Sequence, residues 1–240
     1  MERIDQLWPG GYRFYFDDTL FQPSTDSFVL GAFPKLRRSE RVCDLGAGTG
    51  LLGLLLLARE PSLQITDIEL QKASHDLSLR NAALNGLEQQ ITCLHADLRD
   101  SSQLPQAGSF DLVVSNPPYF SPDSGLVSPQ SARSAARTEL TCTLDDVCAA
   151  AARLLRFGGR FALVFRPDRL ADLIVTLLRH HLEPKRLRFV QNTSDATPSL
   201  LLLEAKKGGH TGLTVDPPLL HYVNNAETNE WQRIYFRDKE

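Results

Sequence analysis

The sequence lacks several features that would place it in other classes of protein. Its 240 residues contain no apolar run near the roughly 20 residues that span a bilayer, and no charged-then-apolar signal at the start. Its four cysteines form no CxxC pair, and no His or Cys stands at metal-ligand spacing. We therefore expect a cytoplasmic protein without a metal, in which Cys43 and Cys93 are buried free thiols.

Strong net charge is also absent. The total is −3, so composition alone does not indicate a nucleic-acid-binding protein. Of the 26 Lys and Arg and 29 Asp and Glu, residues 151–240 carry 14 and 10, which leaves 12 and 19 for residues 1–150. The densest basic stretch is residues 179–188, RHHLEPKRLR. It permits a local basic face that contacts phosphates, and a solvated helix end explains it equally well.

The chain does contain a regular alternation of short apolar runs and helical segments. This alternation predicts a Rossmann-like, doubly wound α/β fold, with a mostly parallel sheet covered on both faces and ligands beyond the carboxyl ends of its strands. The expected strands lie at residues 41–45, 63–68, 91–95, 110–115 and 160–165, followed by a closing pair at 184–190 and 199–205.

We divide the chain into three segments. Residues 1–40 form an N-terminal extension, 41–206 the main domain, and 207–240 a tail that packs back on it. In the extension, aromatic alternation predicts a β-hairpin with a strand at residues 12–16, a turn at 17–18 and a return strand at 20–21.

A short helix then begins at Thr25 or Asp26. These residues act either as its N-cap or, with the helix N-terminus, as a binding site for a carboxylate.

A glycine-rich loop follows the strand at residues 41–45. Gly46, Gly48 and Gly50 stand at alternate positions, which lets the backbone approach a ligand closely. Glu69 ends the next strand, 19 residues past Gly50, the spacing at which a carboxylate meets ribose hydroxyls. This pattern leaves two cofactors open: a nicotinamide or flavin dinucleotide, and S-adenosylmethionine.

Asp44, directly before the glycines, favours the second cofactor. A carboxylate there would repel a pyrophosphate, whereas it can bind the ammonium group of an amino acid. Its simpler role is to cap its own loop. Asp97 ends the third strand and either bonds an adenine amino group or caps the following turn.

The fourth strand stops at Asn116, Pro117, Pro118 and Tyr119, where the prolines end the ladder and stiffen the backbone. The Asn116 side-chain oxygen and the Pro117 carbonyl are both acceptors, so each can take one N–H of an exocyclic amine. The amine lone pair can then localise toward an electrophile. Tyr119 can stack on the base, a contact worth roughly 1–3 kcal/mol. The simpler alternative is a strand that merely ends in a Pro-Pro turn.

Residues 121–141 are rich in Ser, Pro and Gly, as functional lids and disordered segments are. Arg137 within them could contact a phosphate or form a surface ion pair.

With these residues in view, the sequence resembles the S-adenosylmethionine-dependent amino-methyltransferases of the Rossmann-like class. Residues 44–50, DLGAGTG, resemble their cofactor loop, and residues 116–119, NPPY, their catalytic motif. More narrowly, the chain resembles the bacterial methyltransferases that modify N6 of the anticodon-loop adenine of valine tRNA. That match includes ERIDQL at 2–7, TDSFVLGAF at 25–33, LNGL at 84–87 with Asn81, and PPL at 217–219.

The resemblance implies a class I methyltransferase with a seven-stranded sheet and an antiparallel edge strand. It implies a monomer that acts on RNA through a local basic face, although basic residues are not dense near the motif. Glu69 would hold the cofactor ribose and Asp97 its adenine. The other implied cofactor residues are Thr25, Asp44, Gly46, Ala47, Gly48, Gly50, Leu98 and Asn116. The implied catalytic residues are Asn116, Pro117 and Tyr119, and the implied substrate-binding residues are Pro118, Tyr119, Phe120 and Arg137.

Other functions stay open at this point. The NPPY motif also serves enzymes that methylate a glutamine amide in peptide release factors, but these resemble chains with a helical N-terminal domain, for which residues 1–40 are too short. An rRNA base or a small-molecule amine is harder to exclude as substrate. A non-catalytic RNA-binding module that kept the fold is the alternative from another class.

Overall fold

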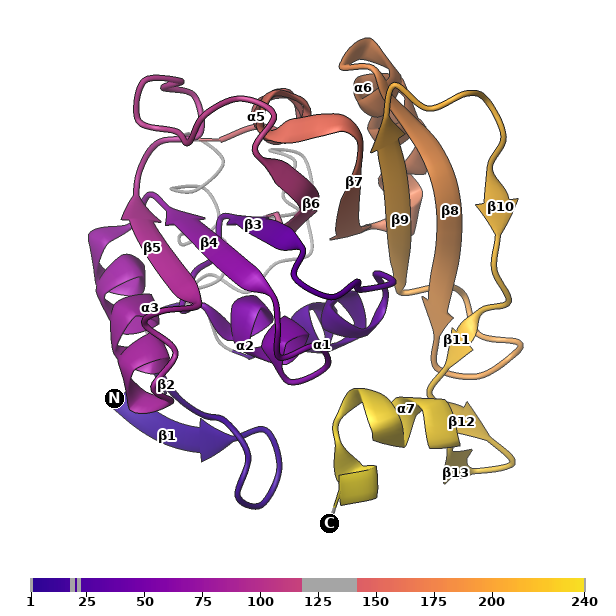
Figure 1. Ribbon diagram of the computed structural model, residues 1–240. Coiled ribbons are helices and arrows are strands. Elements are labelled where there is room, and N and C mark those ends of the chain that lie inside the picture. Colours follow the sequence, from indigo (N-terminus) through magenta and orange to yellow (C-terminus); the bar gives the residue numbers. More distant parts are fainter. Residues whose placement is uncertain (1, 18–19, 21–22, 118–141, 240) are drawn as a thin grey trace.

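The computed structural model describes residues 2–17, 20, 23–117 and 142–239. Its centre is a nine-stranded sheet (Figure 1), in which β11 (Leu219–Leu220) pairs with β8 beside β10. The other strands, in spatial order, are β10 (Thr214–Val215), β8 (Leu182–Gln191), β9 (Leu200–Lys207), β7 (Leu155–Phe165), β6 (Phe110–Ser115), β3 (Arg41–Leu45), β4 (Gln64–Glu69) and β5 (Ile91–His95).

Seven of the nine strands are long, and β10 and β11 have two residues each. The predicted mostly parallel, doubly wound fold is confirmed. Strands β3 to β7 run parallel, and β9 runs antiparallel to both β7 and β8. The antiparallel strand was expected at the edge, but it lies between β7 and β8. The reason is that the chain leaves β7 through helix α6 (Leu170–Arg179) and enters β8 two positions away in the sheet. The next strand, β9, then inserts between β7 and β8. The short strands β10 and β11 then extend the outer edge of β8.

Helices cover both faces of the sheet. Helices α1 (Thr25–Ala32), α2 (Leu51–Leu57) and α3 (Lys72–Leu84) lie on one face, and α5 (Leu144–Leu154) and α6 on the other. Alternate residues of each strand supply the two cores; on β3, Val42 faces the first and Cys43 the second. Cys43 and Cys93 are free thiols as expected, but only Cys43 is fully buried.

The N-terminal hairpin differs from the expected one. Strand β1 (Glu2–Gln6) pairs antiparallel with β2 (Arg13–Asp17), so the strand at 12–16 has its partner before it. The turn therefore lies between Gln6 and Arg13, where Gly10 has φ 77° and the Gly11 N–H bonds the Trp8 carbonyl. The turn predicted at 17–18 agrees with a bond from the Leu20 N–H to the Asp17 carbonyl at 2.9 Å. The return strand at 20–21 is wrong for Leu20, which lies in no strand, and residues 18, 19 and 21 lie outside the described residues.

The C-terminal tail packs against α1. Helix α7 (Asn229–Ile234) buries Trp231 and contacts α1 and β11, and a small ribbon of β12 (Tyr222–Val223) and β13 (Ala226–Glu227) precedes it. Tyr235 stacks on Phe28 with ring centroids 4.5 Å apart. The division into three segments stays a prediction. Within the described part of the chain, no helix has the length and apolar character that crossing a bilayer requires.

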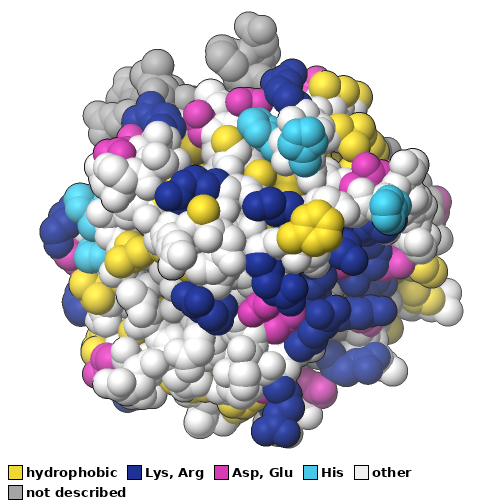
Figure 2. All heavy atoms as spheres, turned by 45° about the horizontal axis from the view of Figure 1, so that its top comes forward, with side chains coloured by type: hydrophobic (Ala, Val, Ile, Leu, Met, Phe, Trp, Pro, Cys, Tyr) yellow, Lys and Arg dark blue, Asp and Glu magenta, His cyan; other side chains and the backbone are white. Residues whose placement is uncertain are grey.

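Basic side chains gather on one face of the molecule. Figure 2 turns the top of Figure 1 forward and shows Lys and Arg concentrated on one side of that face. Among the described strands, β8 contains Lys185, Arg186 and Arg188, and β9 ends in Lys206 and Lys207.

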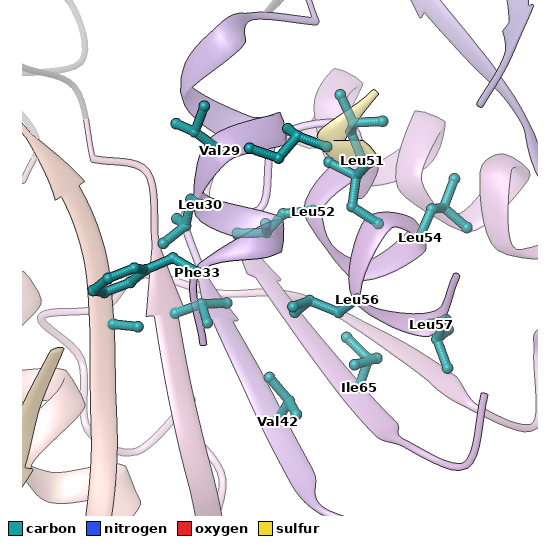
Figure 3. Packing of buried hydrophobic residues seen from close by; sticks show 14 of the residues in the cluster. Val29, Leu30, Phe33, Val42, Leu51, Leu52, Leu54, Leu56, Leu57 and Ile65 are labelled. Carbon is teal, nitrogen blue, oxygen red and sulfur yellow. The ribbon is translucent and has the colours of Figure 1, made fainter. Parts of the chain in front are cut away.

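Tight packing of α1 and α2 on the sheet fixes the loop that precedes α2. All seven residues of α2 are buried. Figure 3 shows Leu30 of α1 and Leu56 of α2 above Val42 and Ile65 of the sheet. A Cβ at Gly31 would come within 2.9 Å of Leu55 Cβ, so glycine allows the two helices their close approach. Each buried leucine stabilises this layer by roughly 1.5–3 kcal/mol.

Candidate active site

The candidate site lies where the order of the strands reverses. From β3 the chain proceeds outward through β4 and β5, and then returns to β6 on the other side of β3. Ligands of doubly wound sheets bind at such a switch point, beyond the carboxyl ends of the strands. The glycine loop follows β3 and Asn116 follows β6. The Ser115 hydroxyl donates to the Leu45 carbonyl at 2.8 Å, which ties the two strand ends together.

The glycine loop takes the conformation that its sequence predicts. Gly46, Gly48 and Gly50 have φ of 72°, 57° and 76°, a region that favours glycine. A Cβ at Gly50 would lie 2.4 Å from the Ser78 hydroxyl oxygen, so the loop is pressed against α3 there. A Cβ at Gly46 would meet no atom within 4 Å, so the space outside the loop is open at that residue. Ala47 between them is buried.

Glu69 holds the loop against the end of β4. Its side chain is 8% exposed. One carboxylate oxygen accepts from the Gly48 N–H at 2.8 Å, and the other accepts from the Gln71 N–H at 2.7 Å. Each oxygen has a second lone pair, so Glu69 can still accept bonds from hydroxyl groups.

Two carboxyl groups lie buried beneath the loop. Asp44 and Asp67 are register partners on β3 and β4, and each is 1% exposed. Among the described residues, Asp44 Oδ2 and Asp67 Oδ1 have no hydrogen-bond partner. Burial, together with Asp67 and Glu69, raises the pKa of Asp44 well above its usual range. An unpartnered buried carboxyl group is costly, and a cationic ligand group would offset that cost.

Asp67 was missed by the sequence analysis. Burial raises the pKa of Asp67 to about 7, against a hydrogen bond from Ser78 that lowers it. The Ser78 hydroxyl donates to Asp67 Oδ2 at 2.9 Å. The available signal was an acidic residue at a core-facing position of a predicted buried strand.

Asp97 stands at the end of β5 as predicted and is engaged by a neighbour. Arg99 donates to both of its oxygens, with Nη2 at 2.6 Å from Oδ2, and the Arg99 N–H donates to Oδ1 at 2.9 Å. These hydrogen bonds lower the pKa of Asp97. The turn-capping contact is therefore present. The role toward an adenine stays a prediction, as does that of the half-buried Leu98 beside it.

Asn116 is half-buried beyond the end of β6 and contacts helix α1. Its Nδ2 donates to the Ser27 hydroxyl at 3.3 Å, and Ser27 is 3% exposed. The sequence analysis missed Ser27, because nothing local pairs a residue with another 89 positions away. Pro117 is buried next to Asn116. The predicted site residues Pro118, Tyr119, Phe120 and Arg137 lie outside the described residues.

Thr25 is the first residue of α1, whose N-cap is Ser24 instead of the expected Thr25 or Asp26. Thr25 is exposed and its hydroxyl accepts from the Tyr235 hydroxyl at 3.1 Å. The Ser24 hydroxyl oxygen is buried without a partner among the described residues. The helix N-terminus beside Asn116 therefore retains donor groups that a carboxylate can use.

The basic stretch at residues 179–188 lies away from this site, and its charges are largely paired. Its arginines bond carboxylates, and the Lys185 ammonium bonds the His210 carbonyl. The ion pairs are Arg179–Asp145 at 2.9 Å, Arg186–Asp216 at 3.0 Å and Arg188–Glu230 at 2.6 Å.

Comparison with known proteins agrees with this geometry. A family model described as methyltransferase small domain matches residues 24–186. A protein of Porphyromonas gingivalis named tRNA1(Val) (adenine(37)-N6)-methyltransferase is 34% identical over 80% of this chain and 78% of its own. A protein of Dickeya chrysanthemi with the same name is 32% identical over 85% of this chain and 82% of its own.

Solved structures show the same fold. A predicted O-methyltransferase of Agrobacterium tumefaciens superposes with a TM-score of 0.73 at 21% identity, covering 88% of this chain and 96% of its own. The geranyl diphosphate C-methyltransferase of Streptomyces coelicolor, solved with S-adenosyl-L-homocysteine, has a TM-score of 0.52 at 14% identity, covering 72% and 73%.

The residues present fit S-adenosylmethionine as the cofactor. The unpartnered Asp44 oxygen suits an ammonium group, the Glu69 carboxylate suits hydroxyls, and the loop is open at Gly46. The protein is thus an S-adenosylmethionine-dependent methyltransferase. It belongs to the methyltransferase small domain family and, within it, to the family of relatives named tRNA1(Val) (adenine(37)-N6)-methyltransferase.

Proposed function

We propose that the protein methylates the exocyclic N6 amine of an adenine in tRNA, namely the anticodon-loop adenine of valine tRNA. The observation that carries the proposal is the position of Asn116, at the switch point beside the glycine loop. The names of relatives that match most of the chain support the choice of substrate.

The chain's own residues would share the work as follows. Asp44 binds the amino group of the cofactor, Glu69 its ribose, and Asp97 with Leu98 its adenine. Backbone groups of residues 46–50 line its path, and the N-terminus of α1 at Thr25 binds its carboxylate. The cofactor supplies an electrophilic methyl group on a sulfonium.

Asn116 would act on the other reactant. Its Oδ1 and the Pro117 carbonyl each accept one N–H of the target amine, which fixes the nitrogen and localises its lone pair. The hydrogen bond from Nδ2 to the Ser27 hydroxyl fixes the orientation of the Asn116 amide, so that Oδ1 lies on the side of the amide away from Ser27. Asn116 is no base at neutral pH, so the surplus proton leaves after transfer.

The remaining substrate contacts belong to the same proposal. Tyr119 stacks on the flipped adenine, and Pro118, Phe120 and Arg137 complete the substrate contacts. The protein acts as a monomer and contacts RNA through a local basic face. Lys206 at the end of β9 is exposed and suits this role, whereas the Lys207 ammonium donates to the Leu155 carbonyl at 2.8 Å. Phe157 stands 77% exposed near them, with its ring against Gly208.

The test is methyl transfer from labelled S-adenosylmethionine to a valine tRNA transcript. Asn116→Ala should lower kcat about 100-fold while cofactor affinity stays within about twofold, since Asp44, Glu69 and the glycine loop still bind the cofactor. A transcript with guanine in place of the target adenine serves as the substrate control and should accept no label. Normal turnover by Asn116→Ala would refute its role. Label that enters protein or rRNA instead would refute the substrate.

A further inference from the structure

Helix α3 turns an unusual polar face toward the interior. Ser74, Ser78 and Asn81 are each 1–3% exposed, at positions where a helix packed on a sheet normally places apolar residues. Buried polar groups are hydrogen-bonded in folded proteins, so their partners reveal what the face does. Ser78 bonds Asp67 beneath the glycine loop. Asn81 bonds two separate segments of the chain.

The first of these segments is the N-terminal hairpin, which two asparagines hold as a neighbouring strand would. Asn85 accepts from the Arg13 N–H at 2.8 Å and donates to the Arg13 carbonyl at 2.7 Å. Asn81 accepts from the Tyr15 N–H at 2.6 Å and donates to the Tyr15 carbonyl at 3.0 Å. Asn81 and Asn85 are one helical turn apart, and this spacing matches that of Arg13 and Tyr15, two residues apart on β2. The two amides thus hydrogen-bond the backbone groups on the outer edge of β2.

The two asparagines differ in one further contact. Asn81 Nδ2 also donates to the Thr49 carbonyl at 2.9 Å, inside the glycine loop. Asn85 instead donates its additional bond to the Asn81 carbonyl within α3. The Asn81 amide therefore joins the hairpin, α3 and the loop, whereas Asn85 joins only the hairpin and α3.

Backbone bonds hold the loop, from the Gly46 and Ala47 N–H groups to the Ile68 carbonyl and from the Gly50 N–H to the Ala47 carbonyl, and two side chains add to them. Glu69 fixes the Gly48 N–H from one side, and Asn81 fixes the Thr49 carbonyl from the other. Without the second bond, the Thr49–Gly50 peptide keeps the bond from its N–H to the Ala47 carbonyl inside the loop. Its carbonyl is then no longer tied to α3, and Gly50 tolerates a wide range of φ and ψ. A loop that must be ordered on binding has a lower affinity for its ligand.

We propose that Asn81 is a positioning residue through which the N-terminal hairpin sets the conformation of the cofactor loop. The hairpin, at residues 2–17, lies before residues 24–186, which the family model matches, and the Asn81 amide links it to the loop. This inference rests on the proposed role of the loop in cofactor binding.

The first experiment compares Asn81→Ala with its matched control Asn85→Ala in the full chain. Both lose one pair of bonds to β2, but only the first loses the bond to Thr49. We expect the calorimetric Kd for S-adenosylmethionine to rise about tenfold in Asn81→Ala and less than twofold in Asn85→Ala. The KM for the cofactor should rise in parallel, with kcat at saturating cofactor nearly unchanged.

A second pair of variants keeps both asparagines and changes the hairpin. Tyr15→Pro removes the N–H that Asn81 accepts, and Arg13→Pro removes the N–H that Asn85 accepts. Tyr15→Pro should weaken cofactor binding several-fold and Arg13→Pro should not. This pair decides the matter if Asn81→Ala fails to fold.

The outcomes separate the two proposals. If the wild-type protein does not bind S-adenosylmethionine, the proposed function fails before the inference is reached. If it binds and Asn81→Ala binds equally well, the inference is wrong. Equal losses in both members of either pair would also overturn it, because they would show general loosening of the hairpin.

Discussion

The two halves of the sheet bury charged groups in opposite ways. On β3 and β4, Asp44 and Asp67 are buried with an oxygen atom that finds no partner in the described part of the chain. On the closing half, Arg160 of β7 is buried and both of its Nη atoms are hydrogen-bonded. This difference in hydrogen bonding separates a place that a ligand completes from a place where the fold itself supplies the partners.

The largest expected effect comes from breaking the completed side. Arg160 bonds both oxygens of Glu40 at 2.7 and 3.0 Å, the Lys35 carbonyl at 2.8 Å and Glu204 at 3.3 Å. Arg160→Met should lower the free energy of unfolding by about 3–5 kcal/mol, because the buried Glu40 carboxylate loses its bidentate partner and keeps only Arg37, through the N–H at 2.9 Å and the guanidinium at 3.9 Å. Urea unfolding measures this loss.

A double variant sharpens the result. Arg160→Met combined with Glu40→Gln removes both charges and should be more stable than Arg160→Met alone. The folded fraction of either variant should bind S-adenosylmethionine as the wild type does. A loss of cofactor affinity would show that this network is part of the site, and the contrast between the two halves would fail.

The opposite result is expected for Asp44. Asp44→Asn removes a buried carboxylate whose Oδ2 has no partner among the described residues, so the free energy of unfolding without cofactor should not fall. Affinity for S-adenosylmethionine should drop roughly 10- to 100-fold, because a charge-assisted hydrogen bond is lost. Calorimetry and urea unfolding of the same samples provide both numbers. Lower apo stability with unchanged affinity would make Asp44 a scaffold residue.

Asp67 makes the free energy of unfolding depend on pH. Its pKa is raised from 3.8 to about 7 in the folded protein, so folded chains hold the proton more tightly than unfolded ones. Stability should therefore fall as the pH rises from about 4 to about 7, and then level off. Asp44, buried beside it, also has a raised pKa, so the change in stability belongs to the pair and not to Asp67 alone. Asp67→Asn should flatten the profile of the unfolding midpoint; an unchanged slope would contradict the assignment.

The contrast also explains what the sequence could reveal. Asp44, the alternate glycines, Glu69 and Asn116 were found because each stands at the end of a strand, a position that local patterns mark. The sequence could not show how distant segments meet. Ser27 beside Asn116 and Asn81 beside Thr49 are contacts across 89 and 32 positions.

Non-local pairing also accounts for the errors in the fold. The strand at β2 was found from its alternation, but its partner β1 lies on the other side of a glycine turn that the pattern did not favour. The position of β9 between β7 and β8 depends on where α6 returns the chain. The arginines of residues 179–188 could not be seen to be paired, because Asp145, Asp216 and Glu230 come from elsewhere in the chain.

The smallest expected effects test whether a basic side chain in an ion pair contributes less to RNA binding than a basic side chain outside one. Arg179 is exposed and paired with Asp145, whereas Lys206 is exposed and makes no ion pair with any described residue. Lys206→Gln should weaken tRNA binding two- to threefold and reduce the slope of log K against log salt by about 0.7–0.9, as one lost phosphate contact requires. Arg179→Gln should change neither, and its stability by less than about 1 kcal/mol. Equal losses in both variants would mean that RNA breaks the Arg179–Asp145 ion pair on binding. Complete hydrogen bonding in the free protein would then not distinguish scaffold residues from RNA-binding residues.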